Sequence, residues 1–253
     1  MILDQFRLDG KVAVVTGGNR GLGLGIATAL AEAGADIVSV QRSTDTATLA
    51  ARVNAPGRQF LPISLDIAQD GAAQQVLELT LARFGRLDIL VNNAGITSRA
   101  PAEDFPLEDW DAIIAVDLRA VFTFCQVCGR HMLRQGHGKI INIASVLAMQ
   151  GGFTVPAYAA SKHAVAGLTK ALCNEWAARG VNVNAIAPGY MATEINTALR
   201  ADPQRNRAIS ERIPAGRWGE PADLGGAAVF LASAASDYVH GQMLIVDGGW
   251  MAR

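Results

Sequence analysis

The chain of 253 residues carries a formal net charge of −1, half of its residues are hydrophobic, and glycine is plentiful. Such a near-neutral charge argues against the broad cationic surface of a nucleic-acid-binding protein. The N-terminal stretch MILDQFRLDGK lacks the basic start and apolar core of a signal peptide, and no apolar run approaches the roughly 20 residues that cross a bilayer. We therefore expect one domain over residues 1–253, located in the cytoplasm, with no nucleic-acid or membrane partner.

Short β-branched runs alternate with helical patterns from one end of the chain to the other. The predicted strands cover residues 11–16, 36–41, 59–65, 87–92, 139–145 and 181–187, with a last strand inside 241–249. The predicted helices are an Ala-rich helix ending near residue 33, helices over 72–84, 107–134 and 222–232, a helix from Pro156 to about residue 180, and a polar helical stretch before residue 222. Nearly continuous apolar strands separated by helices predict an α/β fold, a Rossmann-type doubly wound parallel sheet of about seven strands. Ligands of such sheets bind beyond the carboxyl ends of the strands.

The first predicted strand is followed by the glycine-rich stretch TGGNRGLG, which contains Gly17, Gly21 and Gly23. Glycines allow the backbone to turn sharply and to approach a pyrophosphate, whose charge is stabilised by the N-terminus of the next helix. A structural turn without a ligand would also explain glycines here, but the position between the first strand and a helix favours a dinucleotide site.

The end of the second strand bears on the choice between NAD and NADP. An acidic residue there would bind the ribose hydroxyls of NAD(H) and repel a 2′-phosphate. This chain has Gln41, Arg42 and Ser43 instead, and Arg20 lies in the glycine loop. Two guanidinium groups near the expected phosphate favour NADP(H), with NAD(H) as the alternative if these arginines are ordinary solvated residues.

Tyr158 and Lys162 are four residues apart in VPAYAASKHAV and therefore lie on one face of the predicted helix. A phenol ordinarily ionises near pH 10, and a neighbouring ammonium stabilises its ionised form. Such a pair suits proton transfer to and from the oxygen of a carbonyl or alcohol. Ser145, at the end of the fifth predicted strand, is placed to donate a hydrogen bond to that oxygen. Each residue alone has an ordinary structural explanation, but the set together with the glycine loop favours catalysis.

The cysteines and histidines do not predict a metal site. Cys125 and Cys128 have the spacing of a redox or metal motif, but no second ligand pair lies nearby, so we interpret them as core residues of a helix. The four histidines are scattered without the spacing of metal ligands.

These motifs together resemble the short-chain dehydrogenase/reductase family over essentially the whole chain. TGGNRGLG matches the family's TGxxxGxG loop, NNAG its fourth-strand motif and YAASK its YxxxK motif. The resemblance implies that Tyr158 is the acid/base, that Lys162 assists it, that Ser145 binds the substrate oxygen, and that the protein is a homotetramer. It also implies contacts with the cofactor from Tyr158 and Lys162 and from the following residues: Gly17, Asn19, Arg20, Gly21, Leu22, Gln41, Arg42, Ser43, Asp66, Ile67, Asn92, Asn93, Ala94, Gly95, Pro188, Gly189 and Thr193.

One position departs from the family pattern. The family's fourth catalytic residue is an asparagine on the long helix, and this chain has Asp117 there, in IIAVDLRAVF. Aspartate keeps the backbone carbonyl and can accept hydrogen bonds, but when ionised it cannot donate them. We expect activity to survive with an altered pH profile.

Several segments resemble one group within the family, the 2-deoxy-D-gluconate 3-dehydrogenases that also act as 2-dehydro-3-deoxy-D-gluconate 5-dehydrogenases. This resemblance implies an NAD(P)-dependent oxidoreductase that interconverts a hydroxyl and a ketone on a sugar acid. A sugar acid needs a cation for its carboxylate, and Arg99, just after NNAGITS, is the first substrate-binding candidate beside Ser145 and Tyr158. Two alternatives stay open: a reductase of 3-oxoacyl thioesters on an acyl carrier protein, and a non-catalytic NADP-binding redox sensor.

Overall fold

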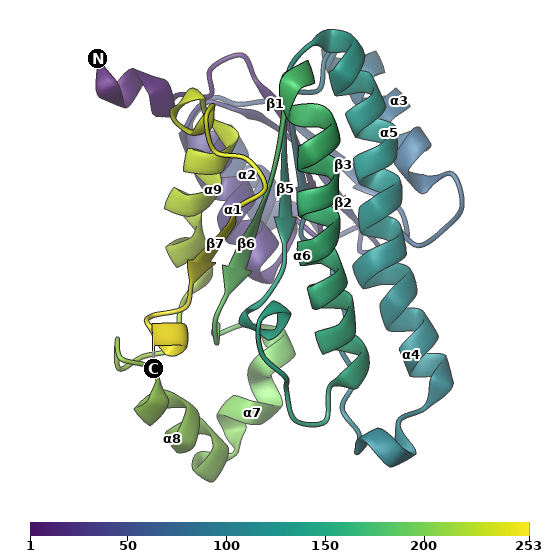
Figure 1. Ribbon diagram of the computed structural model, residues 1–253. Coiled ribbons are helices and arrows are strands. Elements are labelled where there is room, and N and C mark those ends of the chain that lie inside the picture. The colour runs from purple at the N-terminus through teal and green to yellow at the C-terminus, as the bar shows by residue number, and fades with distance from the viewer. Residues whose placement is uncertain (253) are drawn as a thin grey trace.

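The computed structural model of the chain, which describes residues 1–252, contains a seven-stranded parallel sheet with helices on both faces (Figure 1). The strand order is β3-β2-β1-β4-β5-β6-β7. The strands are β1 (Val12–Thr16), β2 (Asp36–Gln41), β3 (Phe60–Ser64), β4 (Ile89–Asn92), β5 (Gly138–Ile143), β6 (Val181–Pro188) and β7 (Met243–Val246). The order of the strands reverses between β1 and β4, which is where doubly wound sheets bind dinucleotides. The predicted fold class is confirmed.

The inner strands β1, β2, β4, β5 and β6 are buried almost throughout, as the continuous apolar runs predicted, whereas the edge strands β3 and β7 are only partly buried. In β1, Val12 and Val14 belong to one core cluster, whereas Ala13 and Val15 belong to the other. The first cluster packs the sheet against α3 (Ala72–Phe84), α5 (Ala120–Gln135) and α6 (Pro156–Trp176). The second packs it against α1 (Gly21–Glu32), α2 (Ala47–Asn54) and α9 (Gly225–Ala232).

Helix α2, between β2 and β3, was not predicted from the sequence. It is only eight residues long, and just two of its side chains, Leu49 and Val53, are buried. Two apolar positions one turn apart are too little periodicity to separate a short helix from a loop.

One helical stretch is long and apolar, although no run able to cross a membrane was predicted from the sequence. On length and hydropathy alone, Leu107–Gln135 would be able to do so. It comprises α4 (Leu107–Ile114), a π-helical turn over Ala115–Arg119, and α5. Phe124 and Met132 of α5 are fully buried in the first core cluster. We interpret the stretch as a core helix of the α/β fold.

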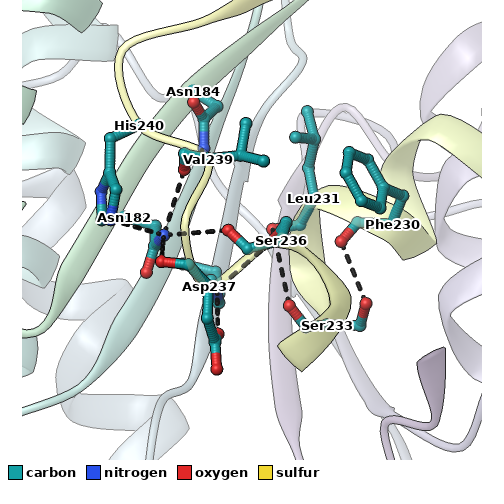
Figure 2. Close-up of polar contacts among 10 residues, drawn as sticks. Asn182, Asn184, Phe230, Leu231, Ser233, Ser236, Asp237, Val239 and His240 are labelled. Atoms are coloured by element: carbon teal, nitrogen blue, oxygen red, sulfur yellow. Dashed lines mark hydrogen bonds and ion pairs between the residues drawn. The ribbon is translucent and has the colours of Figure 1, made fainter. Parts of the chain in front are cut away.

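A polar network fixes the edge strand β7 to its neighbour (Figure 2). Nδ2 of Asn182, at the start of β6, lies within 3.2 Å of the carbonyl oxygens of Ser236, Asp237 and Val239. Nδ2 of Asn184 donates to the same Val239 carbonyl at 2.8 Å. These bonds hold the segment that leads into β7 against the amino-terminal half of β6, away from the carboxyl ends of the strands.

Residues 190–218, here called the covering segment, lie beyond the carboxyl ends of the strands and include α7 (Thr197–Ala201) and α8 (Pro203–Arg212) (Figure 1). A third core cluster anchors this segment, with Trp250 from the C-terminal turn packed among its side chains. The ring of Tyr190 lies 4.5 Å from that of Trp250, and the Arg212 guanidinium lies 3.8 Å from the same indole. The C-terminal turn therefore helps to position the cover over the predicted ligand edge.

Candidate active site

The glycine loop between β1 and α1 is too tight for side chains. Gly17 has a φ of +66°, and a Cβ on Gly23 would lie 2.1 Å from the Gly17 carbonyl oxygen. Since no Cβ fits at that distance, this turn requires glycine. The loop leads directly into Gly21, the first residue of α1, and Leu22 follows it in the first turn. The backbone thus forms a cradle at a helix N-terminus that fits a pyrophosphate.

Asn93 fixes the glycine loop to the end of β4. Its Nδ2 donates to the carbonyl oxygens of Thr16 at 2.9 Å and Gly17 at 3.2 Å. The Thr16 hydroxyl accepts in return from the backbone N–H groups of Asn93 and Ala94, both at 3.0 Å. Thr16 was not among the predicted site residues, although it is the first letter of TGGNRGLG.

Two predicted cofactor residues have side chains that point into the interior. Asn92 is buried, and its Nδ2 donates to Oδ1 of Asn142 at 2.9 Å. Gln41 is buried as well, accepts a short hydrogen bond from Ser39 and donates to the Ile63 carbonyl at 3.4 Å. These side chains hold neighbouring parts of the sheet together, so a contact of either residue with a cofactor has to use its backbone.

The predicted adenosine side of the site is more open. Nδ2 of Asn19 donates to the Asp45 carbonyl at 3.1 Å, which ties the glycine loop to the loop after β2. Arg42 and Ser43 in that loop are exposed, and within residues 1–252 the Arg42 guanidinium forms no ion pair. After β3, Ile67 is buried and a second predicted residue, Asp66, accepts a hydrogen bond from the backbone N–H of Ala68 at 3.0 Å.

The loop after β6 meets the glycine loop. Pro188 ends β6, and the backbone N–H of Gly189 donates to Val246 at 3.0 Å. The Thr193 methyl group lies 3.7 Å from the point where a Cβ on Gly21 would stand. The loops after β1 and β6 are therefore close enough to contact the same ligand.

Helix α6 carries the predicted acid/base pair near its N-terminus, where Pro156 is the first residue. Lys162 is buried, its Nζ lies 5.3 Å from the centre of the half-buried Tyr158 ring, and it donates to the Ile143 carbonyl at 3.0 Å. The end of β5 thereby fixes the lysine. Two residues further on, Ser145 Oγ accepts from the backbone N–H of Leu147 at 3.1 Å, which leaves the hydroxyl proton available for a ligand. The predicted serine, tyrosine and lysine thus come from adjoining elements at the carboxyl edge.

Asp117 is fully buried in the π-helical turn between α4 and α5. Its Oδ1 accepts from the backbone N–H of Ile96 at 2.8 Å, and its Oδ2 lies 3.6 Å from Nζ of Lys162. The second distance is that of an ion pair, longer than a hydrogen bond, and Oδ2 has no other polar partner among residues 1–252. Gly95 packs closely against this carboxylate, since a Cβ there would lie in tight contact with Oδ2, at 3.3 Å.

The charges of this pair depend on each other. Burial raises the pKa of Asp117, and the Lys162 ammonium opposes that rise. Burial alone would lower the pKa of Lys162, but the Asp117 carboxylate and Tyr158 outweigh it and hold the lysine pKa above its usual value. Lys162 is therefore kept as an ammonium at neutral pH in spite of being buried.

Arg99 is an exposed residue of the loop after β4. The next residue, Ala100, donates its backbone N–H to the Thr154 carbonyl at 3.1 Å, just before α6 begins. Arg99 therefore lies close to the approach to Tyr158. Of the arginines in the covering segment, Arg207 is already paired with Glu211 at 2.7 Å, and Arg212 stacks on Trp250.

The two closely spaced cysteines are core residues, as expected. Cys125 and Cys128 are both fully buried in α5. Burial raises the pKa of the Cys125 thiol to about 12 and also raises that of Cys128, which leaves both as unreactive thiols. In the described part of the chain, no group of three or more His, Cys, Asp or Glu side chains is placed to hold a metal ion.

The amino-acid sequence is similar to those of known dehydrogenases and reductases over nearly its full length. A family model described as Enoyl-(Acyl carrier protein) reductase matches residues 17–251. A 2-dehydro-3-deoxy-D-gluconate 5-dehydrogenase of Bacillus subtilis is 55% identical over 99% of this chain and 98% of its own length, and a protein of the same name from Escherichia coli is 52% identical over the full length of both. The chain belongs to the short-chain dehydrogenase/reductase family.

A solved structure of the short-chain dehydrogenase/reductase family supports the same conclusion. A gluconate 5-dehydrogenase from Burkholderia cenocepacia, in complex with NADP and tartrate, is 48% identical, covers 100% of both chains and superposes with a TM-score of 0.95. The two folds therefore agree over their full length.

Replacing Asp117 by asparagine tests the role of the buried charge. The amide oxygen retains the bond from Ile96, but the charge opposite Lys162 is lost at every pH. Since the pKa of Asp117 is raised, the wild-type carboxylate loses its charge at a higher pH than an ordinary aspartate as the solution is acidified. We expect the decrease of kcat/KM at acidic pH that comes from protonation of Asp117 to be absent in Asp117→Asn. Without the carboxylate the pKa of Lys162 is lower, so the decrease of kcat/KM at basic pH begins at a lower pH. At the optimum we expect kcat/KM to be about tenfold lower, equivalent to roughly 1.4 kcal/mol.

The control is Asp109→Asn, which removes a carboxylate of α4 that is bonded to Ser98 in the same loop region. This variant keeps the wild-type pH profile. Superimposable profiles for Asp117→Asn and the wild type would show that the charge of Asp117 has no part in the reaction.

Proposed function

We propose that this protein is an NADP(H)-dependent oxidoreductase that interconverts a hydroxyl and a ketone on a sugar acid of the 2-dehydro-3-deoxy-D-gluconate or 2-deoxy-D-gluconate type. The observation that carries the proposal is the convergence of Ser145, Tyr158 and Lys162 at the carboxyl edge of the sheet, next to the glycine cradle. The names of the similar proteins supply the substrate class.

The glycine loop suits a dinucleotide, because the close approach of Gly23 to the Gly17 carbonyl oxygen forms a tight turn of bare backbone at the N-terminus of α1. The bound nicotinamide supplies hydride transfer to or from the substrate carbon. Ser145 donates a hydrogen bond to the substrate oxygen, and Tyr158 gives that oxygen a proton in reduction or removes it in oxidation. The Lys162 ammonium supplies a fixed positive charge beside this phenol, with Nζ 5.3 Å from the centre of the Tyr158 ring.

Two partners hold the Lys162 ammonium in position next to Tyr158. The Ile143 carbonyl accepts one of its N–H bonds, and Asp117 neutralises part of its charge. An ammonium has three donors and only the Ile143 carbonyl accepts one within hydrogen-bond distance, so a donor remains for a hydroxyl of the cofactor ribose.

Arg20 and Arg42 support the choice of NADP(H) over NAD(H). Arg20 is exposed on the glycine loop and Arg42 is exposed on the loop after β2. The hydrogen bond from Asn19 to the Asp45 carbonyl joins these two loops. Guanidinium groups form forked hydrogen bonds with phosphate oxygens, and the chain lacks the acidic residue that would repel a 2′-phosphate at the end of β2.

Arg99 is proposed to bind the substrate carboxylate, because it is exposed at the approach to Tyr158 and forms no ion pair within residues 1–252. The family resemblance further favours a homotetramer in the cytoplasm. The second candidate is a reductase of 3-oxoacyl thioesters, because the matching family model is described as that of another reductase of acyl-carrier thioesters, an enoyl reductase.

A panel of substrates and both cofactors separates these functions. We expect kcat/KM for keto-hexonates such as 2-dehydro-3-deoxy-D-gluconate analogues to exceed that for acetoacetyl thioesters by at least about a hundredfold with NADPH, because one substrate carries the carboxylate that Arg99 binds. Arg99→Ala raises KM for the hexonates, with little change in kcat. Faster turnover of the thioesters would support the second candidate instead, and the absence of any turnover would support a non-catalytic sensor.

Charge reversal at Arg42 tests the choice of cofactor. Arg42→Asp removes a phosphate ligand and introduces repulsion of the 2′-phosphate, so we expect the ratio of kcat/KM for NADPH to that for NADH to fall by about a hundredfold or more. Arg52→Asp, at an exposed position near the end of α2, is the matched control and leaves the ratio unchanged. A ratio that is the same in Arg42→Asp and in the wild type would contradict the assignment of the phosphate to this loop.

A further inference from the structure

An ion pair joins the glycine loop to the covering segment. Nη1 of Arg20 lies 3.3 Å from Oε2 of Glu194, and the two side chains are 69% and 66% exposed. Arg20 precedes the first residue of α1, whereas Glu194 opens the short 3₁₀ turn Glu194–Asn196 that leads into α7. The pair is therefore a contact between the predicted cofactor loop and the first turn of the cover.

The turn at Glu194 is held by other bonds. The backbone N–H of Thr193 donates to the Met191 carbonyl at 2.9 Å, and that of Asn196 donates to the Thr193 carbonyl at 3.0 Å. Nδ2 of Asn196 donates to Met191 as well, at 2.9 Å. The Glu194 carboxylate can therefore leave Arg20 without unfolding the turn.

Arg20 also lies on the side of the loop where a 2′-phosphate is expected. Its neighbour Asn19 bonds to the Asp45 carbonyl at 3.1 Å, and the backbone N–H of Asp45 donates to Ser43 Oγ at 3.0 Å. These residues belong to the loop after β2, the element that contacts the adenosine ribose in doubly wound folds. Arg42 lies in the same loop, so the bond of Asn19 to Asp45 joins the two loops that carry Arg20 and Arg42.

We propose that Glu194 competes with the 2′-phosphate of NADP(H) for Arg20. This inference rests on the proposed function, since it takes NADP(H) as the ligand of the glycine loop. A phosphate monoester carries more negative charge than a carboxylate and binds a guanidinium by forked hydrogen bonds, so it displaces Glu194. NAD(H) has a hydroxyl at this position and leaves the ion pair in place. Glu194 thus lowers the affinity for NADP(H) selectively.

The test measures the Kd of NADP+ and of NAD+ for the wild type, Glu194→Gln, Arg20→Gln and the double variant, by titration calorimetry. An exposed ion pair is worth at most about 1 kcal/mol, so we expect Glu194→Gln to tighten NADP+ binding by about two- to fivefold and to leave NAD+ binding unchanged. Arg20→Gln weakens NADP+ binding, and in that background the Glu194→Gln change has no further effect.

The control variant is Asp237→Asn, which removes a carboxylate about as exposed as that of Glu194 but paired with Lys139 at the other end of the sheet, and leaves both Kd values unchanged. Three results would overturn the proposal: an unchanged Kd of NADP+ in Glu194→Gln, equal tightening of NADP+ and NAD+, which would place Arg20 on the pyrophosphate, or tightening that persists in Arg20→Gln. Failure of the proposed function is recognised separately, because the wild type itself would then neither bind NADP+ nor turn over a keto acid.

Discussion

A buried ammonium organises the candidate active site. Lys162 is removed from water, yet its charge is maintained by Asp117 on one side and its position by the Ile143 carbonyl on the other. Breaking such a pair leaves an uncompensated buried charge, which is strongly unfavourable. The lysine is therefore confined to a single place, one helical turn from Tyr158. The proposed acid/base chemistry depends on that placement.

The fold brings the partners of Lys162 together from distant parts of the sequence. Asp117 comes from the turn before α5, Ile143 from β5 and Tyr158 from α6, and all meet at the carboxyl edge because parallel strands end on the same side. The π-helical turn displaces one residue from the regular helical path, and such turns occur often at functional sites. The loops after β1 and β6 approach each other at Gly21 and complete the edge.

Local patterns were sufficient to predict most of the fold, and the catalytic set remains a prediction. The strands and the position of the glycine loop follow from apolar runs, and the face shared by Tyr158 and Lys162 follows from helical spacing. Properties that depend on tertiary contacts were not accessible. The sequence did not reveal that the Asn92 side chain turns into the core, that Asp117 touches Lys162, or that Arg20 has Glu194 as a partner. Those contacts join residues far apart in the chain, for which spacing carries no information.

The central claim is that Tyr158 exchanges a proton with the substrate oxygen beside Lys162. The most direct test is a single turnover of Tyr158→Phe, in which prebound NADPH reduces a keto-hexonate and the loss of nicotinamide absorbance is recorded. The account predicts that NADPH still binds and that the rate of hydride transfer falls by about two to four orders of magnitude. Reduction at the wild-type rate in the phenylalanine variant would contradict it.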